Sequence, residues 1–113
     1  MCDIHALGEH GIPRSKDYTS YAMSKAALAE MVRSLARELA PRVRVNAVAP
    51  GVALWPESGP DADTAMHNSY LSKVPLARAG TPEECADVVR WLALEATYLT
   101  GEIIRIDGGR NLV

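Results

Sequence analysis

Residues 43–49 form a nearly continuous apolar segment that ends at Pro50 and Gly51, and this segment constrains the fold more than any other part of the chain. A strand covered on one face alternates apolar and polar residues, whereas a parallel strand covered on both faces is apolar almost throughout. The segment therefore predicts a buried parallel strand. Pro50 and Gly51 would close it at its carboxyl end, which is where open α/β sheets hold their ligands.

A helical pattern precedes this strand over residues 20–40. One face of the expected helix carries an apolar stripe made of Leu28, Val32, Leu35 and Leu39. Pro41 ends the helix, because a proline moves the residue before it out of the helical region. The order so far is a helix followed by a buried strand.

The second half of the chain repeats this order. Residues 52–73 read as an irregular loop and a short polar helix, which act either as a lid or as a plain surface excursion. A further helix has a capping box with Thr81 as N-cap and Glu84 three residues later, and Pro82 fits its first position. Its expected apolar stripe is Cys85, Val88, Val89 and Leu92. A last strand carries Ile103, Ile104 and Ile106 and ends at Asp107-Gly108-Gly109.

Alternating helices and aliphatic strands predict the α/β class with a doubly wound, Rossmann-like parallel sheet. Two strands are too few for such a sheet, because parallel strands need helices on both faces and further strands beside them. We therefore expect residues 1–113 to form one partial domain, the C-terminal part of that fold.

Tyr21 and Lys25 stand one helical turn apart, and the apolar stripe of the first helix extends back through both of them. The positive charge of a lysine favours the ionised form of a nearby phenol, which lowers a pKa that starts near ~10. A phenol whose pKa is lowered by a nearby lysine is a candidate proton donor near neutral pH. The alternative is an ordinary helix tyrosine beside an exposed lysine.

Composition excludes several function classes. The net charge is −2, which gives no basic patch for nucleic acid, and no apolar run is long enough to span a membrane. The N-terminus lacks the features of a signal peptide, and Cys2 and Cys85 fit no metal or redox motif, so we expect free thiols and a cytoplasmic protein. The three histidines share no metal spacing, and each is expected to be a loop residue: His5, His10 and His67.

Three separated blocks, "YAMSKAAL", "LARELAPRVRVNAVAPG" and "YLTGEIIRIDGG", resemble the C-terminal half of the short-chain dehydrogenase/reductases. Within that family, "DIHA", "PGVALWPE" and "KVPLARAG" look most like the bacterial pteridine reductases. The resemblance implies a reductase that uses NADPH and acts on a pterin or dihydrofolate. A 3-oxoacyl carrier-protein reductase or a general carbonyl reductase is the alternative.

The resemblance also implies roles for single residues. Tyr21 would donate the proton, and Lys25 would hold the nicotinamide ribose. The backbone of Pro50, Gly51 and Val52 would pass along the nicotinamide. Two further residues would meet the substrate: Asp3, as a carboxylate that accepts pterin N–H groups and relays a proton, and Trp55, as an apolar wall beside the ring. Asp3 could instead belong to a frayed terminus.

The family's glycine-rich turn, which holds the pyrophosphate, has no counterpart here, so we expect a C-terminal fragment in which Met1 is an internal methionine. The choice between NADP and NAD is therefore not readable from this chain. The family also implies a homotetramer for the full-length form. A function of another class remains open, namely a catalytically inactive truncated fragment that at most associates with other chains.

Overall fold

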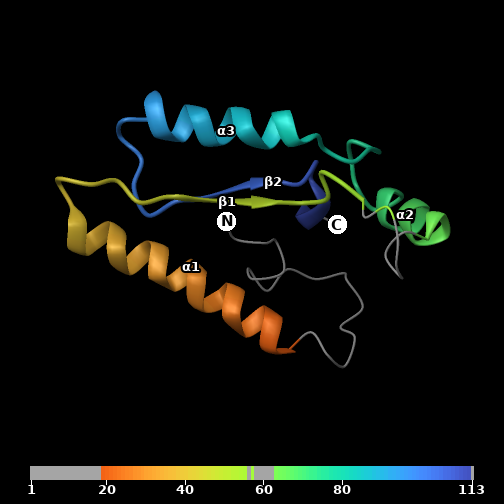
Figure 1. The fold of residues 1–113 in the computed structure, drawn as a ribbon, viewed down its shortest axis with the longest axis horizontal. Coiled ribbons are helices and arrows are strands. Elements are labelled where there is room, and N and C mark those ends of the chain that lie inside the picture. Colours follow the sequence, from red (N-terminus) through yellow and green to blue (C-terminus); the bar gives the residue numbers. More distant parts are fainter. Residues whose placement is uncertain (1–18, 56, 58–62, 113) are drawn as a thin grey trace.

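The computed structural model describes residues 19–55, 57 and 63–112, and it has the expected order of a helix, a strand, a short helix, a further helix and a last strand (Figure 1). The elements are α1 (Thr19–Leu39), β1 (Ala47–Pro50), α2 (Thr64–Leu71), α3 (Pro82–Leu94), β2 (Ile103–Ile106) and the 3₁₀ turn η3 (Arg110–Leu112). The short polar helix predicted before residue 73 is α2.

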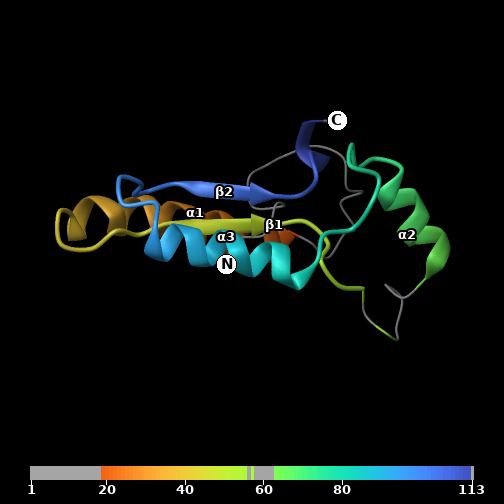
Figure 2. The same ribbon diagram turned by 90° about the horizontal axis from the view of Figure 1, so that it is seen from above.

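The two strands form a parallel pair with helices on both sides. Ala47 pairs with Ile103 and Pro50 with Ile106, so both strands end at the same edge of the sheet. Figures 1 and 2 show α3 on one face of the pair and α1 on the other, which gives three layers. The parallel arrangement confirms the α/β prediction for this part of the chain.

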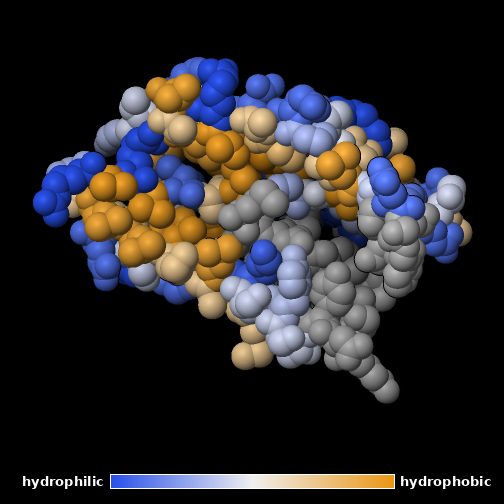
Figure 3. All heavy atoms as spheres, in the orientation of Figure 1, coloured by the Kyte–Doolittle hydropathy of each residue, from blue (hydrophilic) through white to orange (hydrophobic). Residues whose placement is uncertain are grey.

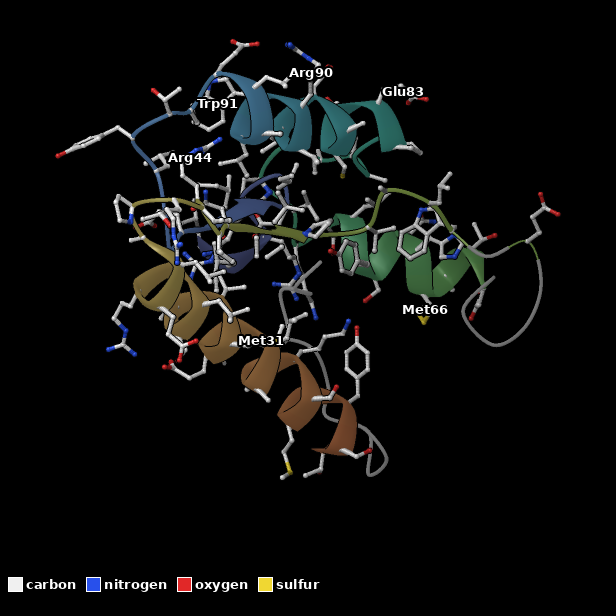
Figure 4. All side chains as sticks on the ribbon, turned by 60° about the vertical axis from the view of Figure 1, so that its left-hand side comes forward. Met31, Arg44, Met66, Glu83, Arg90 and Trp91 are labelled. Atoms are coloured by element: carbon white, nitrogen blue, oxygen red, sulfur yellow. The ribbon has the colours of Figure 1, made fainter. Side chains whose placement is uncertain are left out.

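The first strand begins later than its apolar sequence suggested, because the polar side chain of Arg44 has partners outside the sheet. Its guanidinium donates to the carbonyl oxygens of Leu92 and Ala96 at 2.8 Å each and of Ala93 at 2.9 Å. The carbonyls of Leu92 and Ala93 have no partner within α3 because they lie at its C-terminal end, where a cation also complements the helix dipole. Figure 4 shows Arg44 below the last turns of α3, near Trp91.

The side chain of Asn46 binds the backbone of the segment between α3 and β2. Its Nδ2 donates to the carbonyl of Leu99 at 2.9 Å, and its Oδ1 accepts from the backbone N–H of Glu102 at 3.1 Å. One amide therefore satisfies a donor and an acceptor of the segment that leads into β2. The regular ladder starts one residue later, at Ala47.

The buried face of α1 is shifted by one residue from the predicted stripe. Its buried residues are Ala29, Val32 and Ala36, and the leucines of the predicted stripe lie half-buried at the sides. Ala29 packs against the fully buried Ala49 of β1, with Leu28 beside them. Small side chains at this contact let the helix backbone approach the strand closely, and the leucines cover its flanks.

The start of α3 has the capping box that the sequence predicted. Thr81 Oγ1 accepts from the Glu84 backbone N–H at 3.2 Å, and Glu84 Oε2 accepts from the Thr81 N–H at 2.9 Å. Leu92 is buried with Val48 and Ala96 on the inner face of this helix. Val89 was wrongly predicted to belong to the buried stripe, because 49% of it is exposed.

Glu84 also binds Arg78, which comes from the segment before α3. The two Nη atoms of Arg78 donate to the two carboxylate oxygens at 2.9 and 2.6 Å. This bidentate contact, followed by the bond from Thr81, lowers the pKa of the Glu84 carboxyl from 4.5 to about 2. Both side chains remain about half exposed, so water screens the pair.

The Arg78–Glu84 pair predicts an acid-sensitive contribution to stability. A carboxyl whose pKa is lower in the folded state stabilises the fold at every pH above its pKa in the unfolded chain. This contribution disappears as the pH falls from about 4.5 to about 2. The urea midpoint of the wild type should therefore exceed that of Glu84→Gln at neutral pH and approach it in acid. A difference between the two midpoints that stays constant over this range would contradict the prediction.

Many large apolar side chains of the described residues remain at the surface. Figure 3 shows apolar side chains gathered between α3 and α1, beside the two-stranded sheet. Within residues 19–55, 57 and 63–112, half of the eight buried hydrophobic residues are alanines, and Leu54, Leu94 and Tyr98 are among the most exposed large ones. Apolar side chains scattered singly over a surface are ordinary, whereas a group of them is typical of a surface that packs against further protein. Among the described helices, none is long and apolar enough to cross a membrane.

Candidate active site

The predicted tyrosine–lysine pair lies in the first two turns of α1. Lys25 Nζ is 5.3 Å from the centre of the Tyr21 ring. This separation is within the range of a cation–π contact and follows from the i, i+4 spacing on one helix. Figures 1 and 2 both show this end of α1 at about the same position along the long axis of the molecule as the carboxyl ends of β1 and β2.

The two side chains differ in burial. Lys25 is half-buried because it lies four residues before Ala29, on the line of the buried face of α1. Tyr21 lies on the flank of that face and is 36% exposed. Both residues were expected on the inward face of the helix, but only Lys25 lies along it. The phenol of Tyr21 is accessible to a small molecule.

The Pro50-Gly51 corner is held tightly between β1 and the segments around it. The N–H of Gly51 donates to the Ile106 carbonyl at 2.9 Å, and the carbonyl of Val52 accepts from the Gly80 N–H at 2.9 Å. A Cβ on Gly51 would lie 3.1 Å from Cα of Asp107 and 3.2 Å from Oη of Tyr70. Glycine therefore permits a close approach of three segments here.

Trp55 is half-buried and contacts two rings of α2. Its ring centre is 3.8 Å from that of His67, with the planes inclined by 20°, and 5.6 Å from that of Tyr70, which it meets edge-on at 87°. The prediction that His67 is a loop residue was wrong, since it lies in α2. The i, i+3 spacing of His67 and Tyr70 indicates that both rings share one side of a helix, but it does not indicate that Trp55 contacts them.

The other end of the site is formed by the turn after β2. Asp107 accepts from the backbone N–H groups of Gly109 at 2.9 Å and Asn111 at 3.1 Å, so its side chain has a structural role in this turn. Gly108 and Gly109 have φ angles of 63° and 84°, so the turn needs glycine. The guanidinium of the buried Arg110 lies 5.7 Å from the ring centre of Tyr70.

A hollow of about 510 Å³ lies next to the corner, between the segment before α3, the start of α3 and the end of β2. Val52, Tyr70 and the Arg78–Glu84 pair are part of its lining. Tyr21, Lys25 and Trp55 do not line it. We therefore base the candidate site on the tyrosine–lysine pair and the corner, where the chemistry lies, and not on this hollow.

The remaining predicted residues add little to the site. Asp3 lies outside the described residues, as do Cys2, His5 and His10. Cys85 carries a free thiol, whose pKa is raised by burial and by the nearby Glu84 charge. Within the part of the chain that the structure describes, no group of three metal-ligating side chains is present.

Comparison with known proteins gives matches over almost the whole chain. Residues 7–111 match a family model described as enoyl-(acyl carrier protein) reductase. The 3-oxoacyl-(acyl-carrier-protein) reductase of Thermotoga maritima is 46% identical over 101 residues, which make up 88% of this chain and 41% of that protein. The dihydromonapterin reductase of Citrobacter koseri is 39% identical over 111 residues, or 97% of this chain and 45% of that protein.

The structural comparison agrees with the sequence matches. A crystal structure from Brucella melitensis, described as a short-chain dehydrogenase/reductase and glucose/ribitol dehydrogenase, is similar with a TM-score of 0.76 and 32% identity. The similarity covers 96% of this chain and 40% of that one. The chain thus spans about two fifths of the length of the relatives that it matches.

Proposed function

The chain belongs to the short-chain dehydrogenase/reductase family, a family of NAD(P)H-dependent oxidoreductases, and we propose that Tyr21 and Lys25 serve a reductase reaction as proton donor and supporting cation. The observation that carries this proposal is the pair itself, with Lys25 Nζ 5.3 Å from the Tyr21 ring centre in the first two turns of α1. An ammonium group at this distance stabilises the phenolate that proton donation leaves behind.

The residues present fit a nicotinamide cofactor at the corner. Reduced nicotinamide, when bound, supplies the hydride of the reaction. Lys25 would hold the ribose hydroxyls, and the backbone of Pro50, Gly51 and Val52 would lie along the ring. The fit rests on the corner: it lies at the sheet edge where open α/β folds bind ligands, and Gly51 lets Asp107 and Tyr70 pack closely around it. We propose NADPH as the cofactor.

For the substrate we propose a pterin or a dihydrofolate. The reductases of pterins are among the relatives that match the largest share of this chain, at 97%. Asp3 would accept N–H groups of the ring, and Trp55 would lie beside it. Reduction of a ring C=N bond needs one hydride and one proton, and Tyr21 would supply the proton. In its full-length form we propose a homotetramer.

A 3-oxoacyl thioester is the second candidate substrate. The observation in its favour is the higher identity, 46%, to a relative named as a 3-oxoacyl-(acyl-carrier-protein) reductase. Such a substrate offers a ketone and no ring N–H groups. It would therefore use Tyr21 but gain nothing from Asp3.

The test compares oxidation of NADPH by the purified protein with dihydrobiopterin and with acetoacetyl-coenzyme A. We expect a higher kcat/KM with dihydrobiopterin, and Asp3→Ser should lower turnover of this substrate more than that of the thioester. An equal loss with both substrates, or no loss with either, would count against the pterin assignment. A chain that neither oxidises NADPH nor changes its fluorescence in a titration would instead be the inactive, associating form.

A further inference from the structure

The aromatic contact between Trp55 and α2 is not part of the hydrophobic core. No residue of α2 is buried, and its half-buried side chains include both rings that contact Trp55. The helix is held at its start by Asp63, whose carboxylate accepts from the Ala65 N–H at 2.9 Å. The contacts of His67 and Tyr70 with Trp55 therefore connect this helix to the loop that follows β1.

Tyr70, Trp55 and His67 form a continuous set of ring contacts, called the column below, that starts at the Pro50-Gly51 corner. The hydroxyl of Tyr70 lies beside Gly51, and the Tyr70 ring and the Trp55 indole form an edge-to-face pair with planes at 87°. His67 then covers one face of the indole at 3.8 Å and nearly parallel to it. An indole with two ring contacts has a restricted plane, which lowers the entropy that a ligand must remove on binding.

We propose that His67 is a positioning residue, which orients the indole of Trp55 so that it receives a flat heteroaromatic ring at the corner. The proposal rests on the proposed function, since it concerns the substrate of the same site. His67 itself would not touch the substrate. It would act through Trp55, and a stack of this kind needs a planar ring at position 67 and not a particular hydrogen bond.

This role distinguishes flat substrates from acyl chains. A heteroaromatic ring gains from an indole whose plane is already fixed, because aromatic pairs depend on their relative orientation. A 3-oxoacyl chain has no π face and gains little from the same orientation. Loss of the His67 ring should therefore raise KM for a ring substrate and leave kcat and the thioester reaction nearly unchanged.

The binding test uses folate as the probe in a Trp91→Phe background, in which Trp55 is the only tryptophan. Quenching of Trp55 fluorescence gives the Kd for folate without any turnover. We expect His67→Ala to raise this Kd about 3- to 10-fold, the size of one lost aromatic pair. His67→Phe should restore it. The control Asn68→Ala, at an exposed position of the same helix, should leave it unchanged.

The outcomes separate this inference from the proposed function. Wild-type Kd values in His67→Ala, or no rescue by His67→Phe with α-helical circular dichroism intact, would overturn the positioning role. Thioester reduction that depends on Tyr21, without folate binding in the wild type, would refute the role of Trp55 as a binding surface for a flat ring and support the assignment as a reductase. Folate binding that depends on His67, without reduction of any substrate, would support the column and refute the reductase.

Discussion

Replacing Tyr21 by phenylalanine should lower kcat/KM of the reductase reaction by about 10²- to 10⁴-fold, the range for loss of a positioned proton donor. The substitution removes one hydroxyl and keeps the ring that lies beside Lys25 Nζ. The Kd for NADPH, measured by its fluorescence, should therefore stay close to that of the wild type. The loss should appear mainly in kcat, since the proton is needed only in the transition state.

Tyr98→Phe is the matched control for this prediction. Tyr98 is fully exposed, in the turn between α3 and β2, and lies far along the chain from α1. The same loss of a hydroxyl at this position should leave both kcat and KM unchanged. Activity of Tyr21→Phe within a few-fold of the wild type would remove Tyr21 from the reaction and leave the proton donor to another group.

Replacing Leu92 by alanine should lower the free energy of unfolding by about 2–5 kcal/mol. Leu92 is 7% exposed and packs with Val48 and Ala96 between α3 and the sheet. Truncation removes buried methyl groups and leaves a cavity among the branched aliphatic side chains around it. Because domains of this kind are stable by only about 5–15 kcal/mol, the loss should be large enough to shift the urea midpoint strongly.

Leu94→Ala provides the comparison within the same helix. Leu94 is 69% exposed, so the same truncation removes little buried surface and should change stability by less than about 0.5 kcal/mol. The difference between the two variants, measured by urea unfolding followed by circular dichroism, isolates burial from helix propensity. Equal costs would show that α3 does not pack on the sheet as the structure has it.

Local signals in the sequence predicted the fold well where neighbouring residues decide the outcome. The capping box of Thr81 and Glu84 needs only residues within one turn, and the structure has it. Pro41 and the apolar run before Pro50 predicted where α1 ends and where β1 ends. The parallel direction of the two strands followed from the alternation of helices and strands.

Contacts between distant residues were not predictable in the same way. The early start expected for β1 was wrong because Arg44 binds carbonyls about 50 positions away, and Asn46 binds across the same gap. The tyrosine–lysine pair could be predicted because both residues share one helix. The stacking of His67 on Trp55 could not, since it depends on how the loop after β1 returns to α2.

The double contact of Asn46 has a consequence for sequence drift at the junction of the two strands. An aspartate would keep the acceptor for Glu102 but lose the donor to Leu99, and an alanine would lose both. Only a side chain with an amide of this length serves both neighbours. A protein engineer who grafts this strand pair into another scaffold would have to carry the asparagine along, whatever the surrounding residues become.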